Sequence, residues 1–387
     1  MELQNVGIAR CGKWIKRPEN VNFVILGKSY KSSSAKSKLE IFSFDPKTTT
    51  LESSPLTEQE IEDGEPVSIA VHPNGDQIIC ATSSGDCKIF ELCVQETSTK
   101  LLAKEAPSLE GVGLQNCVAF SIDGCKLGMG GEDGRLRILE WPSMRIIIDE
   151  PAAHKSFRDM DFSLDSEFLV STSTDGSARV WNVNEGVPVA TLKRSANEKI
   201  ELCCFSKDGT KPFVFCTVQR AKLKPITAVW DMSTWKRIGY KVLLGKPASV
   251  MSTSPDGKYL AQGSKDGDFC VVDVNNMRIS HWSKRLHPGT SIGGVLEFCP
   301  SERVVLTTTE EWGTKVTKLT VPADWKDWQI YTLLLILLLA SAVAFYIFYV
   351  YSDSFWQVPG TTQHSRPKFD TLIGDPQSED PFGPLDL

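Results

Sequence analysis

The feature that most constrains the fold is a repeat of about 45 residues that runs through residues 13–322. Six segments each carry a strand-like run, a turn and a second strand-like run. The first turns fall at Gly75, Gly124, Ser166, Gly209, Gly257 and Glu302. Second turns follow at Gly85, Gly134, Gly176, Gly267 and Gly313. A period of this length indicates stacked copies of one small structural unit.

Each copy predicts a small antiparallel sheet. Apolar and polar residues alternate within the runs, and "DG" or "NG" pairs supply the turn conformations of hairpins. One such sheet cannot bury both of its faces, so copies stack radially. "VWN" at 180–182 and "VWD" at 229–231 are typical of WD repeats, and "WIKRPENVNFVILG…LEIFSFD" adds a further copy. The predicted fold is all-β, a seven-bladed WD-type β-propeller.

The ends of such a ring need a closing device, because an open sheet edge exposes unpaired backbone groups. We expect the residues before Lys13 to pair with the last blade.

A different signal follows the repeats. The stretch "WQIYTLLLILLLASAVAFYIFYVYS", residues 328–352, contains no charged residue, and aromatic residues gather at both of its ends. About 20 apolar residues suffice to cross a bilayer, and aromatic side chains are enriched at both lipid–water interfaces. We therefore expect a propeller over 1–322, a linker over 323–328, a single transmembrane helix over 329–352 and a short, disordered tail over 353–387.

The orientation of the predicted span depends on the soluble part. The N-terminus has no apolar leader, and the eleven cysteines include no CxxC pair or zinc-like spacing. Buried, reduced cysteines are typical of the cytosol. Lysines and arginines flank the span in similar number on its two sides, so they do not determine its orientation in the membrane. We expect a cytosolic propeller and a lumenal tail.

Several function classes are disfavoured. The net charge of −6 argues against nucleic-acid binding. The five histidines show no metal or triad spacing, and "GMGGED" is not followed by a helix-like segment, as a dinucleotide site would require. The aspartates that recur at first turns, Asp123, Asp165, Asp208 and Asp256, fit turn chemistry. We predict no catalytic residue, metal ligand or cofactor, and no enzymatic activity of the chain's own.

Two stretches are candidates for partner binding. A basic, glycine-poor loop separates two strand-like runs of the first blade, and a loop of this length is usually functional or disordered. Its candidate residues are Lys28, Tyr30, Lys31, Lys36 and Lys38. In the apolar span, small residues four apart allow another membrane helix to approach closely. The candidates there are Ala340, Ser341 and Ala344.

The order of these features resembles the endoplasmic-reticulum (ER) exchange factors that load GTP onto the small GTPase of the COPII coat. The similarity is clearest in "NFVILG", "LEIFSFD", "FRDMDFSLDSEFLVSTSTDGSARVWNV" and the apolar span. In that family the first-blade loop is rich in glycine and asparagine, holds a potassium ion with its carbonyls and acts on the GTPase. Here only Gly27 and then "KSYKSSSAKSK" occur, so we expect exchange to be lost.

With "KWIKRPENVNFVILGKS" and "LEIFSFDPKTT", the chain resembles a plant branch of that family, the phosphate transporter traffic facilitators. The resemblance implies a single-pass ER membrane accessory that lets plasma-membrane phosphate transporters leave the ER. Its implied partners are those transporters as cargo and the COPII small GTPase or coat components. The alternatives are an active exchange factor for that GTPase and an unrelated membrane-anchored propeller scaffold.

Overall fold

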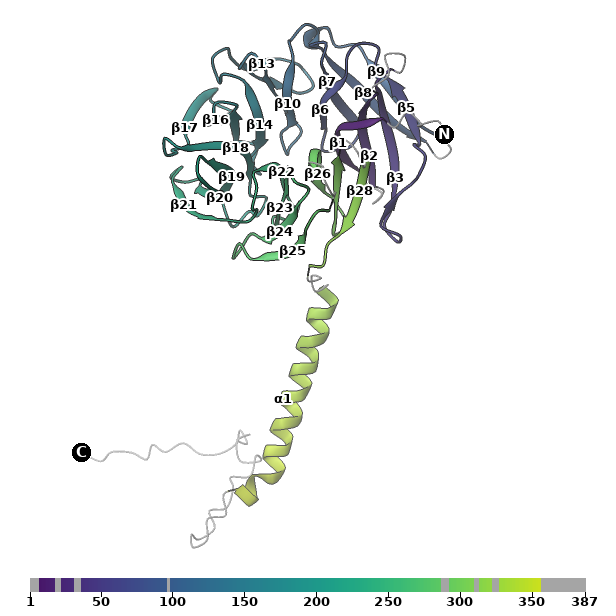
Figure 1. Cartoon of the computed structure of the whole chain (residues 1–387). Coiled ribbons are helices and arrows are strands. Elements are labelled where there is room, and N and C mark those ends of the chain that lie inside the picture. Colours follow the sequence, from purple (N-terminus) through teal and green to yellow (C-terminus); the bar gives the residue numbers. More distant parts are fainter. Residues whose placement is uncertain are drawn as a thin grey trace, which may run out of the picture. The chain divides into compact units, whose positions relative to one another are not determined.

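The computed structural model describes residues 7–17, 22–30, 36–95, 98–286, 292–309, 313–321 and 327–355. The chain divides into two compact units, with the boundary after Val321. The first unit is a ring of seven antiparallel sheets, so the predicted seven-bladed propeller is confirmed (Figure 1). The second contains helix α1, Asp327–Phe355.

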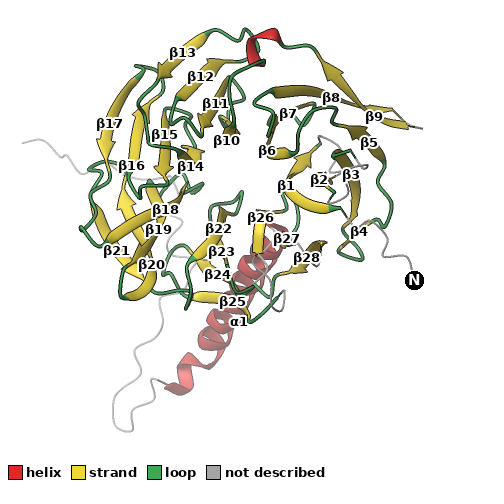
Figure 2. Cartoon of the chain, turned by 45° about the horizontal axis from the view of Figure 1, so that its top comes forward, coloured by secondary structure: helices red, strands yellow, loops and turns green. Residues whose placement is uncertain are grey.

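Within each blade the strands follow one another outward from the centre of the ring (Figure 2). The innermost strands are β1 (Ile8–Lys16), β6 (Pro66–Val71), β10 (Gln115–Phe120), β14 (Phe157–Phe162), β18 (Glu198–Phe205), β22 (Ala248–Thr253) and β26 (Ile292–Phe298). The second strands are β2 (Asn22–Ser29), β7 (Gln77–Thr82), β11 (Lys126–Gly131), β15 (Phe168–Ser173), β19 (Phe213–Arg220), β23 (Tyr259–Ser264) and β27 (Val304–Thr309).

The third strands are β3 (Lys38–Asp45), β8 (Cys87–Gln95), β12 (Leu136–Glu140), β16 (Ala178–Asn182), β20 (Leu223–Asp231), β24 (Phe269–Asp273) and β28 (Gly313–Lys318). The outer strands are β4 (Thr50–Leu51), β5 (Thr57–Glu60), β9 (Ser98–Lys104), β13 (Ile146–Glu150), β17 (Val187–Thr191), β21 (Arg237–Lys241) and β25 (Ile279–Ser283). In the first blade both β4 and β5 pair with β3. A short 3₁₀ helix, Pro107–Leu109, lies between the second and third blades.

The recurring turn aspartates have the structural role that the sequence indicated. In each of four blades the aspartate Oδ1 accepts a hydrogen bond from the backbone N–H two residues further on, at 2.9–3.1 Å. These residues are Asp123, Asp165, Asp208 and Asp256. A carboxylate that accepts a hydrogen bond from its own turn in this way stabilises the hairpin. This role agrees with turn chemistry.

The core is divided among the seams between neighbouring blades. Seven clusters of buried residues each combine side chains of two adjacent blades, all within the described part of the propeller. At the seam of the fourth and fifth blades, for example, Val170 and Val180 pack with Phe205 and Trp230. A blade therefore buries its faces only when both neighbours are present, which makes the ring the stable unit.

Ring closure can be compared with the prediction only for the described residues before Lys13, because residues 1–6 lie outside the described part of the chain. The described ones belong to β1, which pairs with β2 and with no strand of the last blade. The first and last blades are joined by packing, in which Trp14 and Val24 meet Val295 and Leu306. The backbone N–H of Trp14 also donates to Glu297 Oε2 at 2.9 Å. Among the residues that the structure describes, the first and last blades are thus joined by side-chain packing and this hydrogen bond.

His154 illustrates how a single blade is held together. Its Nε2 and the Oγ of Ser171 are 2.8 Å apart, and Trp181 Nε1 donates to the same oxygen at 2.9 Å. His154 is buried, and this burial lowers the pKa of its imidazole to about 4. The histidine is therefore neutral at physiological pH and serves as a structural hydrogen-bonding group.

α1 agrees with the predicted apolar span. Residues Trp328–Tyr351 form a stretch of 24 residues with mean hydropathy 2.7, and none of it is buried by the protein. A helix of this length and composition can cross a bilayer.

Candidate functional site

The basic loop of the first blade is shorter than its sequence suggested. β2 continues to Ser29 and β3 starts at Lys38, and the ladder between them still pairs Lys28 with Lys38. Lys28 and Lys38 are therefore strand residues at the base of the loop, which is a correction to the expectation that they lie on it. Tyr30 and Lys36 lie in the connection, and Lys31 falls outside the described residues.

Lys28 is held by acidic and aromatic neighbours. Its Nζ lies 2.5 Å from Glu40 Oε2 and 5.1 Å from the centre of the Phe42 ring. Tyr30 donates its hydroxyl hydrogen bond to the other carboxylate oxygen, Glu40 Oε1, at 3.3 Å. Burial and the nearby Glu40 carboxylate raise the pKa of Tyr30, so the phenol keeps its proton. The three polar groups satisfy one another beneath the loop.

The two other described lysines also have acidic partners. Lys38 Nζ lies 2.8 Å from Glu58, and Lys36 Nζ lies 3.4 Å from Glu60. The hydrogen bond to Glu58 raises the pKa of Lys38. Sequence reasoning missed all three glutamates, although the alternation in "LEIF" carries a signal for Glu40. Each described lysine of the cluster therefore has a carboxylate beside it.

Gly27, the one glycine near the loop, has a packing role. It lies inside β2, and a Cβ placed there would come 2.7 Å from Cys11 Sγ and 2.7 Å from Pro66 Cβ. Its φ is not in the left-handed region. Gly27 allows the second blade to approach β2 and does not provide the unusual backbone conformation that converging carbonyls would need.

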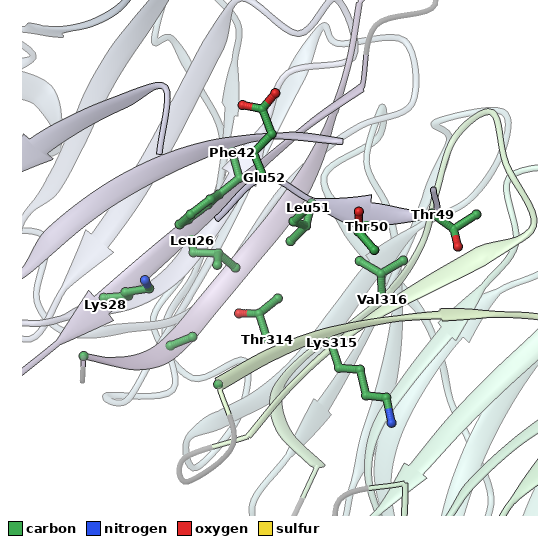
Figure 3. A pocket seen from close by; sticks show the side chains of 13 residues that line it. Leu26, Lys28, Phe42, Thr49, Thr50, Leu51, Glu52, Thr314, Lys315 and Val316 are labelled. Atoms are coloured by element: carbon green, nitrogen blue, oxygen red, sulfur yellow. The ribbon is translucent and has the colours of Figure 1, made fainter. Parts of the chain in front are cut away.

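A cavity of about 440 Å³ adjoins this site. Leu26, Lys28 and Phe42 line it from the first blade, and Thr314 and Val316 line it from the last blade (Figure 3). The cavity therefore joins the loop base to the open side of β28.

The larger cavity lies at the centre of the ring. It measures about 600 Å³ and is lined by residues of all seven innermost strands. Its charged groups are mostly paired, for example Lys207 with Asp161 at 3.2 Å and Arg158 with Glu201 at 3.0 Å. Among the described residues, no cluster of three or more histidine, cysteine, aspartate or glutamate side chains could hold a metal.

The predicted helix-packing residues lie on α1. Ala340, Ser341 and Ala344 are all exposed on the isolated helix. Ser341 Oγ donates to the backbone carbonyl of Leu338 at 2.7 Å, so this hydroxyl is satisfied without a second helix. What the three residues offer to a neighbour is their small size.

Comparisons with known proteins agree with the architecture. The family model of the WD domain, G-beta repeat, matches residues 148–182, which include β14, β15 and β16 of the fourth blade. SEC12-like protein 1 of Arabidopsis thaliana is 56% identical over 370 residues, which cover 94% of this chain and 92% of that protein. This chain belongs to the SEC12-like family.

Two further relatives are less similar in sequence to this chain. SEC12-like protein 2 of Arabidopsis thaliana is 30% identical over 72% of this SEC12-like chain and 71% of its own length. The guanine nucleotide-exchange factor SEC12 of Rattus norvegicus is 25% identical over 45% of each chain. The similarity to SEC12-like protein 1 thus extends over nearly the whole chain, while the similarity to the exchange factor covers less than half of it.

Proposed function

We propose that this SEC12-like chain is an ER membrane accessory that promotes the exit of plasma-membrane phosphate transporters from the ER without nucleotide-exchange activity. The observation that carries the proposal is the base of the first-blade loop. There Lys28 and Tyr30 both bond to Glu40, in the place where the exchange factors that the chain resembles have a glycine- and asparagine-rich loop. An ammonium group at this position opposes the binding of a second cation.

The proposed topology is a single pass with the propeller in the cytosol and the tail in the lumen. All eleven cysteines are free, and nine of them are buried. Burial raises the pKa of such thiols, for example that of Cys11 to about 12, which keeps them protonated and unreactive. Free thiols suit a reducing compartment.

Cargo export provides the direct test. Plant cells that lack this chain should retain a fluorescent phosphate transporter in the ER, and expression of the full chain should return it to the plasma membrane. A matched reporter, an unrelated plasma-membrane protein, should leave the ER equally well in both cells. Equal retention of both reporters would indicate a general export role and would contradict the proposed cargo specificity.

The second candidate is an active exchange factor for the COPII small GTPase. It is favoured by the 25% identity to the rat exchange factor over 45% of each chain. A general export defect together with stimulated nucleotide exchange would support it.

A further inference from the structure

Among the described residues, the last blade is one strand short. Its sheet contains β26, β27 and β28, whereas every other sheet has four or five strands in the described residues. β28 pairs with β27 on one side, and no described strand pairs with its other side. A strand edge of this kind presents a row of backbone donors and acceptors to any extended segment that approaches.

The open edge faces a groove that can hold side chains. The cavity of about 440 Å³ lies beside β28, and Figure 3 shows Thr314 and Val316 pointing toward it. Leu26 and Leu51 form its apolar opposite wall. The hydroxyl of Thr317 is buried and has no hydrogen-bond partner in the described chain. The edge therefore has an apolar groove on the face of Val316 and an unsatisfied hydroxyl on the opposite face.

The spacing after β28 is too short for an outer strand like those of the other blades. In the third to sixth blades, nine or ten residues lead from the end of the third strand to the end of the outer strand, as in 141–150. Only the eight residues 319–326 separate β28 from α1.

We propose that an extended segment of a partner protein adds to β28 as the fourth strand of the last blade. Its side chains on one face would enter the groove over Val316 and Leu51, so they should be apolar. Those on the other face would lie beside Lys315, which is exposed and points away from the groove, so they should be acidic (Figure 3). A strand with this alternation gains main-chain hydrogen bonds from the edge and specificity from the two faces.

This surface adjoins the lysine cluster, because Lys28 lines the same cavity, but the inference does not depend on which cargo the chain serves. The probe is a blocked peptide of alternating glutamate and valine, as long as β28, added to the full chain in lipid nanodiscs. We expect binding by fluorescence anisotropy and slower amide hydrogen exchange in residues 313–318. The same peptide with alternate N-methylated amides, which cannot complete the ladder, should bind at least about tenfold more weakly.

A charge-reversed variant supplies the second readout. K315E should weaken binding of the acidic peptide, whereas K265E, at an exposed turn of the sixth blade, should leave it unchanged. Equal binding of the N-methylated and unmodified peptides would overturn the inference. So would β28 amides that are protected without peptide and become exposed on deletion of residues 2–6, because the edge would then be occupied by the chain's own N-terminus.

Discussion

Lys28 and Glu40 form an ion pair across β2 and β3, with 2.5 Å between Nζ and Oε2. The side chain of Glu40 is only 7% exposed, and that of Lys28 is 22% exposed. The lysine that the sequence placed among solvent-exposed loop cations is thus the partner of a buried carboxylate. Removal of one member of such a pair leaves the other charge without compensation.

We therefore expect K28S to lower the free energy of unfolding by about 1–3 kcal/mol, because the buried carboxylate of Glu40 keeps only the Tyr30 hydroxyl as a partner. K38S should change it by no more than ~0.5 kcal/mol, since its ion pair with Glu58 is largely exposed. Chemical denaturation of the full chain in nanodiscs measures both. The double variant K28S/E40Q should recover part of the loss, and equal effects of K28S and K38S would contradict the assignment.

The outer lysines of the loop test the binding role without disturbing the fold. The triple variant K31S/K36S/K38S keeps Lys28 and should leave the unfolding midpoint almost unchanged. If the loop meets an acidic partner segment, transporter exit from the ER should fall, and binding measured in vitro should weaken as salt rises. Normal exit with the triple variant would remove the loop from the binding surface.

Two buried groups give opposite pH dependences. Asp159 lines the central cavity, where burial and the neighbouring Asp161 carboxylate raise its pKa to about 7. Between pH 4 and 7 the folded chain holds a proton that the unfolded chain has released, so the free energy of unfolding falls as pH rises, by at most ~1.4 kcal/mol per unit. Burial lowers the pKa of His154 to about 4. Its contribution therefore rises with pH between about 4 and 6.5.

Because the two contributions to the free energy of unfolding oppose each other over pH 4.5–6.5, single variants should separate them. D159N removes the contribution that falls with pH, so the free energy of unfolding should rise more steeply with pH. H154Q removes the contribution that rises with pH, so the free energy of unfolding should fall as pH rises. Denaturant midpoints measured at several pH values provide the test. Curves that stay parallel to that of the unmodified chain would show that neither group titrates as described.

The small residues of α1 give a prediction about the membrane. Replacing Ala340 and Ala344 together with leucine should reduce co-purification with a phosphate transporter several-fold, because bulk on that face prevents close helix packing. V343L, which changes a residue that is already large, is the matched control. Insertion should be normal in all variants, and unchanged co-purification of the double variant would exclude this face.

Much of the fold could be predicted because local pattern and global architecture agree. The repeated turn aspartates bond to their own backbone, as at Asp123 and Asp256, and strand alternation fixes which side chains enter the seams. The apolar span could be predicted equally well, because the thickness and the apolar interior of a bilayer determine the length and the composition of a helix that crosses it. The number of blades followed from the count of six repeats together with the N-terminal copy.

The contacts of the candidate site were harder to predict from the sequence, because they depend on strand register. Lys28 and Lys38 stand directly opposite each other, and their like charges are compensated by Glu40 and Glu58 from β3 and β5. β5 pairs with β3 only after the turn through β4, and "TEQE" has no apolar alternation that would reveal this register. The packing of the first blade against the last could not be predicted for a related reason, since the contacts around Trp14 and Val295 leave no short sequence motif.

The central claim is that this SEC12-like propeller has lost exchange activity at its first blade. The most direct measurement is release of fluorescent GDP from the COPII small GTPase in the presence of the full chain in nanodiscs. We expect the release rate to match the intrinsic rate at every concentration, while an active SEC12 exchange factor accelerates it in the same assay. A saturable acceleration by this chain that disappears when residues 30–37 are deleted would contradict the account.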